Sequence, residues 1–138
     1  MLIKQFDYLP EHAIKIRKDV FVTEQGFIDE FDEYDTQAKH FVGYINDIPV
    51  ATCRTFFNPE VQSHVVGRIA VIREYRGKGL GNSIMKAAED CIKEMGGKKA
   101  MLSAQVRVSD FYKKQGYMKQ GDVFMDQDCP HIWMDKEL

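Results

Sequence analysis

The stretch HVVGRIAVIREYRGKGLGN, residues 64–82, decides the fold. Its first part, His64–Val71, is rich in β-branched side chains and predicts a strand. A glycine-rich loop follows, and the residues from about Asn82 to Met95 carry apolar side chains at helical spacing. Gly96-Gly97 is typical of a helix end, because glycine readily adopts the left-handed conformation that closes a helix. The stretch therefore predicts a strand, a glycine loop and a helix in succession.

The segments on either side extend this alternation. Lys99–Ala104 follows the helix, and because a crossover helix returns the chain alongside the strand before it, this segment is predicted to pair in parallel with residues 64–71. The pair Asn46-Asp47 and the group Asp128-Cys129-Pro130 predict turns. The other predicted strands are Met1–Phe6, His40–Ile45, Val50–Phe57, Tyr117–Met125 and His131–Lys136, and the other predicted helices are Pro10–Glu24 and Val108–Gln115.

Length and charge limit the function classes. The chain has 138 residues, with 19 Lys and Arg against 21 Asp and Glu, and a formal net charge of -2. A chain of this length buries enough surface to form one core without metals or disulfides, so we expect a single domain over residues 1–138. Nucleic-acid binding usually needs a clear basic excess, so the charge argues against a nucleic-acid partner.

The cysteines and the apolar runs indicate the compartment. Cys53, Cys91 and Cys129 are far apart and form no C-x-x-C pair, so the sequence predicts neither a disulfide framework nor a metal site. No apolar run reaches the roughly 18 residues of a membrane span, and the first residues lack the features of a signal peptide. We therefore expect a cytoplasmic protein without a membrane partner. Exposed sheet edges in small domains often pair, which leaves a homodimer open.

The loop Arg76-Gly-Lys-Gly-Leu-Gly81 has the properties of a phosphate site. Its glycines let the backbone approach a ligand without interference from Cβ atoms, and the following helix offers unpaired N–H groups and the positive end of its dipole. The Walker A pattern is absent, and Asn82 stands where the fingerprint G-x-G-x-x-G requires its third glycine. A plain glycine-rich turn is the structural alternative.

Two motifs are similar to the signatures of the GNAT superfamily of acyl-CoA-dependent N-acyltransferases. Arg76-x-x-Gly79-x-Gly81 matches the family pattern [RQ]-x-x-G-x-[GA] between a strand and a helix, and Phe111-Tyr112-x-x-x-Gly116-Tyr117 matches its second signature, F-Y-x-x-x-G-[FY]. Further segments resemble the ElaA-like branch of the family and extend the likeness over nearly the whole chain. They are Arg17-x-x-Val20-Phe21-Val22-x-Glu24-Gln25, the acidic segment to Asp35 with His40, Leu102-Ser103-Ala104-Gln105 and Pro130-His131-Ile132-x-Met134.

The resemblance implies an α/β (α+β) fold. The family's sheet is mixed, mostly antiparallel and twisted, with about six to seven strands, one splayed parallel pair and about three to four flanking helices. The resemblance also implies acetyl-CoA as co-substrate and direct transfer of the acetyl group to a primary amine of a small molecule or a protein. A CoA-binding regulatory or interaction module with the same fold is the alternative function. An interaction protein in which the loop is only a turn is a further alternative.

The resemblance also assigns a donor site. Backbone groups of the strand before the loop would pair with the pantetheine arm, and a backbone N–H there would polarise the thioester carbonyl. The pyrophosphate would lie on the loop, where the arginine and lysine side chains add positive charge. Gln105 stands near a position at which many family members carry Asn, and it is a candidate for contact with the pantetheine arm. The candidate cofactor-binding residues are Ile69, Ala70, Val71, Arg76, Gly77, Lys78, Gly79, Leu80, Gly81, Asn82 and Gln105.

Tyr112 is the candidate acid. It matches the family tyrosine that donates a proton to the departing thiolate or hydrogen-bonds it. A phenol, with an ordinary pKa of about 10, is protonated at neutral pH, which suits an acid rather than a base. In the structural alternative, Tyr112 is a core residue beside Phe111.

Glu24 and His131 are the candidate bases, and His40 is a third. Each has a side chain that can take the amine proton directly or through water. Each also has a structural alternative: a helix-end salt bridge for Glu24, a strand cap for His40 and a hydrogen bond near a sheet end for His131. An acceptor that binds as a free base needs no enzymic base.

The acidic run Asp29–Asp35 is interpreted first as a solvated loop. In the functional alternative it attracts a cationic acceptor. Arg68, inside the strand before the loop, faces either the acceptor cleft or the outer surface, because side chains alternate along a strand.

Overall fold

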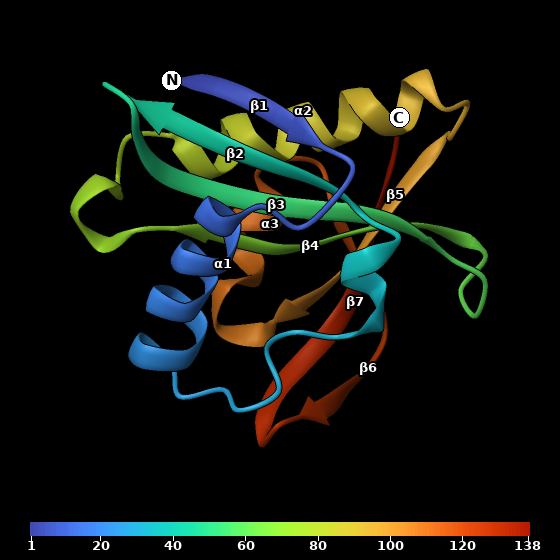
Figure 1. The fold of residues 1–138 in the computed structure, drawn as a ribbon. Helices are drawn as coiled ribbons and strands as arrows, with labels where there is room; N and C mark the ends of the chain where they lie inside the picture. Colours follow the sequence, from blue (N-terminus) through green and yellow to red (C-terminus); the bar gives the residue numbers. More distant parts are fainter.

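The computed structural model describes residues 1–138, and it contains one seven-stranded sheet (Figure 1). The strand order is β1-β2-β3-β4-β5-β7-β6. All neighbouring strands are antiparallel except β4 and β5. This arrangement confirms the predicted fold class. The strands are β1 (Leu2–Phe6), β2 (Lys39–Ile45), β3 (Ile48–Asn58), β4 (Ser63–Val71), β5 (Lys99–Gln105), β6 (Met118–Asp126) and β7 (Cys129–Glu137).

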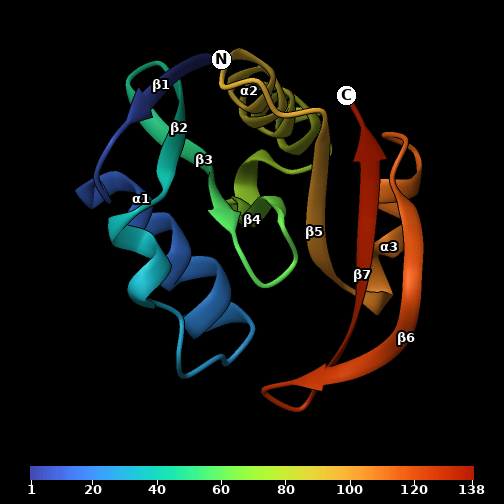
Figure 2. The same ribbon diagram turned by 90° about the vertical axis from the view of Figure 1, so that its right-hand side faces the viewer.

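The parallel strands β4 and β5 pair only where they begin. His64 lies opposite Ala100 and Val65 lies opposite Met101, and no later residue of β4 has a partner on β5. This splayed pair divides the sheet into an N-terminal arm, β1–β4, and a C-terminal arm, β5–β7. Figure 2 shows the two arms diverging on either side of the β4–β5 pair.

Helices cover both faces of the N-terminal arm. The helix α1 (Glu11–Arg17) continues directly into a π-helical segment, Lys18–Glu24. The helix α2 (Leu80–Glu94) lies on the opposite face, as Figures 1 and 2 show. The short helix α3 (Ser109–Lys113) follows β5. No helix is both long enough and apolar enough to cross a membrane. Single 3₁₀ turns cover Glu33–Thr36, Arg73–Tyr75 and Val106–Val108.

Glycine conformations set both ends of α2. The helix begins at Leu80, slightly before the predicted start near residue 82, because Gly79 at φ +76° occupies its N-cap position. It ends where Gly96 adopts φ +86° and the N–H of Gly97 donates to the carbonyl of Ile92 at 2.9 Å. This is the glycine-terminated helix end that the sequence predicted.

Two predicted boundaries in the second half of the chain are wrong. The helix expected over residues 108–115 is shorter, because a 3₁₀ turn precedes it and Gly116 at φ +97° follows it. The last turn consists of Gln127 and Asp128, both in the left-handed region, since Cys129 already belongs to β7. The predicted Asn46-Asp47 turn is confirmed, with both residues at positive φ.

Apolar side chains of both long helical segments hold them on the sheet. Ile84, Met85 and Ile92 of α2 are fully buried in the larger core cluster, and Ile16 of α1 is buried in a second cluster on the other face. Each such side chain contributes about 1.5–3 kcal/mol through burial. The core therefore fixes the N-terminal arm, and with it the position of the β4 edge and the loop that follows.

Candidate functional site

A cavity of about 580 Å³ lies where the two arms part. It is lined on one side by β4 and the π-helical segment and on the other by β5, α3 and the β6–β7 turn. Lys78 and Asn82, two of the predicted donor-site residues, lie outside the lining. The other predicted donor-site residues line it: Ile69, Ala70, Val71, Arg76, Gly77, Gly79, Leu80, Gly81 and Gln105.

The backbone of β4 presents an unpaired edge to this cavity. Beyond Val65, the strand has no partner on the β5 side. On its other side, Ala70 and Val71 pair with β3, which fixes their position. An exposed strand edge of this kind can bind an extended ligand through backbone hydrogen bonds.

The glycine loop connects this edge to the N-terminus of α2. Gly77 and Gly79 have φ values of +80° and +76°, a conformation in which other residues are strained. No side chain caps α2, so the N–H groups of its first turn remain available. A Cβ atom at Gly81 would lie 3.1 Å from Cζ of Phe111 in α3, so glycine lets α3 approach the loop closely. The loop thus combines a turn that requires glycine with an open helix N-terminus, which suits an anionic ligand.

Arg76 and Glu24 are bound to each other at the edge of the cavity. The Nη1 and Nη2 atoms of Arg76 donate to the Glu24 carboxylate at 2.6 and 2.9 Å, and its Nε donates to the carbonyl of Val71 at 2.9 Å. The hydrogen bond from Arg76 lowers the pKa of Glu24. The predicted base and the predicted phosphate ligand therefore form an ion pair.

Tyr112 lines the cavity from α3 and is almost fully buried. Its ring packs edge-on against Phe111 and Tyr117. Burial raises its pKa to about 12, and its hydroxyl group makes no hydrogen bond within the protein. The residue thus has both a packing role and a protonated hydroxyl that is available to a ligand.

His131 lies on β7 and lines the cavity, whereas His40 does not. The Nδ1 atom of His131 lies 2.8 Å from the carbonyl oxygen of Cys129, so it carries the hydrogen, and Nε2 has no partner in the protein. His40 is 1% exposed, its Nε2 contacts the carbonyl of Asp35, and burial lowers its pKa. Of the two histidines, only His131 lines the cavity.

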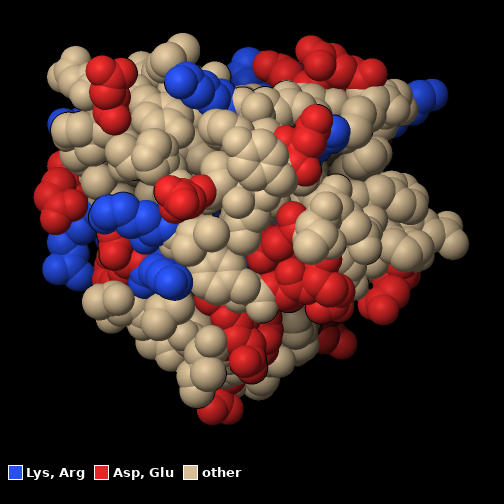
Figure 3. Space-filling view, viewed as in Figure 1, with Lys and Arg blue, Asp and Glu red and all other residues tan.

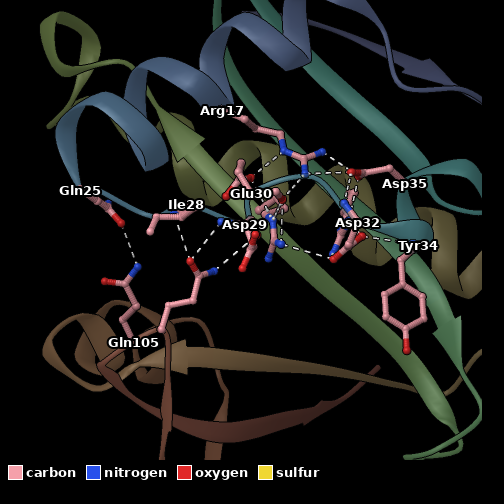
Figure 4. A network of polar contacts seen from close by, with 12 residues as sticks. Arg17, Gln25, Ile28, Asp29, Glu30, Asp32, Tyr34, Asp35 and Gln105 are labelled. Carbon is pink, nitrogen blue, oxygen red and sulfur yellow. Dashed lines mark hydrogen bonds and ion pairs between the residues drawn. The ribbon is translucent and has the colours of Figure 1, made fainter.

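Gln105 connects the two arms. Its Nε2 donates to Oε1 of Gln25 at 2.9 Å, a contact drawn in Figure 4, and its Oε1 accepts from Nε of Arg107 at 3.0 Å. Both polar atoms of the side-chain amide are therefore in use. A contact with a pantetheine arm would replace one of these hydrogen bonds.

The interpretation of the acidic run as a solvated loop is wrong for its buried members. Arg17 of α1, which is 1% exposed, binds Glu30 at 2.8 Å and Asp35 at 2.7 Å (Figure 4). Arg54 of β3 contacts Asp32 at 2.7 Å and Asp35 at 2.8 Å. Because the arginines lie far from the acidic run in sequence, no local pattern predicted these pairs.

The same network sets the protonation of its carboxylates. Burial works against ionisation of Asp35, but the hydrogen bonds and charges of Arg17 and Arg54 lower its pKa to about 2. Burial raises the pKa of Glu30. The segment is thus fastened to the N-terminal arm by ionic contacts.

Arg68 faces the cavity rather than the outer surface. It adopts φ +53° where the β3–β4 register shifts, a conformation uncommon for a residue other than glycine. Its guanidinium group binds the Glu30 carboxylate at 2.9 Å and the Glu30 carbonyl oxygen at 2.9 Å. Alternation along the strand left the orientation of Arg68 open, and the structure shows a bulge at this point that interrupts the alternation.

Acidic side chains gather over the centre and lower part of the face that carries α1, as the space-filling view shows (Figure 3). Residues 25–37 contain no Lys or Arg, and neither do residues 120–131. These two segments border the cavity on that face. This side of the cavity therefore has an acidic rim.

Comparisons with known proteins agree with this architecture. The model of the acetyltransferase (GNAT) domain matches residues 11–138. The uncharacterized protein YyaT of Bacillus subtilis is 37% identical over 133 residues, which cover 91% of this chain and 87% of YyaT. Protein ElaA of Escherichia coli is 30% identical over 130 residues, which cover 91% of this chain and 85% of ElaA.

Solved structures have the same fold. The crystal structure of Escherichia coli ElaA aligns with a TM-score of 0.85 over 99% of this chain and 100% of that chain, at 28% identity. A GNAT family acetyltransferase from Elizabethkingia anophelis with acetyl-CoA bound aligns with a TM-score of 0.76 over 99% of this chain and 97% of that chain, at 14% identity. Since the family model covers nearly the whole chain and ElaA is similar in both sequence and structure, the chain belongs to the GNAT acetyltransferase family, in the branch that contains ElaA.

Proposed function

We propose that the protein is an acetyl-CoA-dependent N-acetyltransferase that transfers the acetyl group directly to a primary amine in a ternary complex. One observation carries the proposal: the unpaired edge of β4 leads through the glycine loop into the uncapped N-terminus of α2. A strand edge suits the amide groups of a pantetheine arm, and a helix N-terminus suits a pyrophosphate. The acetyl-CoA bound to the Elizabethkingia anophelis relative supports the same donor.

The donor would bind mainly to the backbone. Residues 69–71 would offer their N–H and C=O groups to the pantetheine arm, and the N–H groups of residues 77–82 would face the pyrophosphate. Arg76 would give up part of its contact with Glu24 to approach a phosphate. Lys78, whose Nζ lies 5.2 Å from the centre of the Tyr75 ring, would add positive charge from outside the cavity.

Tyr112 would act as the acid. In the reaction, the amine nitrogen bonds to the carbonyl carbon of the thioester and the carbon–sulfur bond breaks, so the sulfur leaves with an electron pair and needs a proton. Burial raises the pKa of Tyr112 to about 12, so its hydroxyl holds its proton at neutral pH until a thiolate forms beside it. A backbone N–H of the β4 edge would stabilise the carbonyl oxygen as it gains charge.

His131 would accept the proton that the amine loses. Its Nε2 atom is free because Nδ1 is held by the carbonyl oxygen of Cys129. Proton transfer would run directly or through one water molecule. Glu24 is the weaker candidate, because its ion pair with Arg76 lowers its pKa and so its basicity.

The test measures free thiol released from acetyl-CoA in the presence of a panel of primary amines, with mass detection of the acetylated product. Thiol release that depends on both the protein and the amine supports the proposal. Binding of acetyl-CoA without transfer to any amine would favour the alternative function, a CoA-binding module that does not catalyse transfer.

A further inference from the structure

A glutamine in the β6–β7 turn ties the two arms together beside the cavity. Oε1 of Gln127 accepts hydrogen bonds from the backbone N–H groups of Ile28 at 3.0 Å and Asp29 at 3.1 Å, and its Nε2 donates to the carbonyl of Asp29 at 3.4 Å. Figure 4 draws these bonds, and Figures 1 and 2 both place the hairpin tip beside the segment that follows the π-helix. We call this contact of Gln127 with the backbone of Ile28 and Asp29 the glutamine clasp.

The backbone of the turn does not explain the presence of a glutamine. Gln127 has φ +47° and Asp128 has φ +61°, the geometry of a tight hairpin turn that favours Asn and Gly. A longer side chain in this conformation carries a conformational cost. The hydrogen bonds of the Gln127 side chain are those of the clasp, and Gln127 lines the cavity. Its side chain therefore serves the contact between the arms rather than the turn.

The segment held by the clasp is also fixed on both sides. Before it, Gln25 contacts Gln105, and the N–H of Phe27 donates to the carbonyl of Phe21 at 2.9 Å. After it, Glu30 is held by Arg17 and Arg68. Only Ile28 and Asp29 lie between the anchors Phe27 and Glu30, and the clasp holds both of them. The segment is therefore a fixed bridge rather than a hinged lid.

This bridge restricts what can approach the cavity from the face that carries α1. A polypeptide that presents a lysine needs room for its own backbone beside that side chain. The clasp occupies the space between residues 28–29 and the β6–β7 turn with direct hydrogen bonds. The exposed carboxylates of Asp29, Asp126 and Asp128 lie in the clasped segment and beside Gln127, and they attract a cation.

We propose that the glutamine clasp makes the acceptor opening of the cavity selective for a small, free, cationic amine and excludes a lysine within a polypeptide. This inference rests on the proposed acetyltransferase function and names the acceptor class for that same site. Gln127 thereby acts as a specificity-determining residue without taking part in the chemistry.

The test compares three variants. Gln127→Asn keeps a side-chain amide and favours the left-handed turn, but it is one methylene too short for both bonds. Gln127→Glu keeps an oxygen that accepts from both N–H groups, but its second oxygen replaces the Nε2 donor that contacts the carbonyl oxygen of Asp29. Gln120→Ala is the matched control, since Gln120 lies in the same hairpin and hydrogen-bonds only within the C-terminal arm, to Asp135 at 3.1 Å. Acetylation of ethanolamine, putrescine and glucosamine is compared with acetylation of an N-acetylated peptide that contains one lysine.

The wild-type protein is expected to acetylate at least one of the small amines with a far higher kcat/KM than the peptide. Loss of two hydrogen bonds, each with a net effect of about 1 kcal/mol, should raise the peptide-to-amine ratio of kcat/KM about tenfold or more in Gln127→Asn. Gln120→Ala should keep the wild-type ratio, and Gln127→Glu, which keeps the two bonds to the N–H groups, should change it less than Gln127→Asn does. Hydrogen exchange gives a readout without turnover: the amides of Ile28 and Asp29 should exchange faster in Gln127→Asn only.

The possible failures can be told apart. Equal acetylation of the peptide and the amines by the wild-type protein, an unchanged ratio in Gln127→Asn, or transfer to the peptide with none to any small amine would overturn the acceptor class. If hydrogen exchange showed no protection of the Ile28 and Asp29 amides in the wild-type protein, the clasp itself would be overturned. Absence of acetyl-CoA binding by the folded protein, or binding without transfer to the peptide or to any amine, would instead overturn the proposed function.

Discussion

Glu24 and Arg76 join the end of the π-helical segment to the start of the glycine loop through two hydrogen bonds, at 2.6 and 2.9 Å. The arginine of the family motif is therefore held by a carboxylate next to the region proposed for the pyrophosphate. The pair links the acceptor side of the cavity to the donor side. It also gives Glu24 a structural role that competes with a role as base.

The variant Glu24→Gln separates these two roles. Because the pair is near the surface, where such pairs contribute about 0–1 kcal/mol, the substitution should leave kcat within about threefold of the wild-type value. Steady-state thiol release at saturating acetyl-CoA measures this. If kcat fell a hundredfold or more and the pH profile of kcat lost its acidic limb, Glu24 would be the base.

The variant Tyr112→Phe tests the proposed acid. The substitution keeps the aromatic packing against Phe111 and Tyr117 and removes only the hydroxyl group. We expect kcat to fall by about two to four orders of magnitude, while the Kd for acetyl-CoA changes little. Equal losses in affinity and rate, measured by calorimetry and thiol release, would reduce Tyr112 to a packing residue.

The variant Asp35→Asn tests the buried ionic network. Removing this carboxylate takes one of its two carboxylate partners from each arginine, since Arg17 keeps Glu30 and Arg54 keeps Asp32. The cost should therefore be measurable but below the about 3–5 kcal/mol of a buried charge left with no partner. Urea unfolding measures the loss. The control Asp19→Asn removes an exposed i,i+4 pair with Lys15 and should cost less than about 0.5 kcal/mol. Similar effects of the two substitutions would contradict a stabilising network.

The pH dependence of stability follows from the same carboxylate. The pKa of Asp35 is about 2 in the folded protein, whereas an unfolded aspartate titrates near 3.9. Between these values the unfolded state binds more protons, so the contribution of Asp35 is complete above about pH 4 and is lost as the pH falls through about 2. Urea unfolding at pH 5 and pH 3 should show this loss in the wild-type protein and a smaller one in Asp35→Asn. If the wild-type protein and Asp35→Asn lost the same free energy of unfolding between pH 5 and pH 3, groups other than Asp35 would cause the loss.

Much of the fold was predictable because its signals are local. The β-branched run before the loop, the helical spacing after it and the glycine pair at its end each indicate one element. The parallel pairing of residues 99–104 followed from the crossover helix, which returns the chain alongside the strand before it. The family motifs placed Tyr112 and the loop, and both line one cavity in the structure.

What the sequence did not predict depends on contacts between distant residues. The partners of Asp35 lie on α1 and β3, and the clasp joins Gln127 to residues 28 and 29. The cavity-facing position of Arg68 arises from a bulge, which shifts the alternation of side chains. Periodicity and motif spacing carry no information on such pairs, so the acceptor side of the cavity needed the structure.

The most direct test of the central claim is calorimetric titration of the protein with acetyl-CoA, with ATP and NAD as phosphate-bearing controls. The wild-type protein should bind acetyl-CoA at one site and should bind neither control. Gly79→Asp, which places a carboxylate at the helix N-terminus, should abolish binding, whereas Gly79→Asn, similar in size and tolerant of φ +76°, should retain most of it. Absence of acetyl-CoA binding in the folded wild-type protein, or equal binding by Gly79→Asp, would contradict the account.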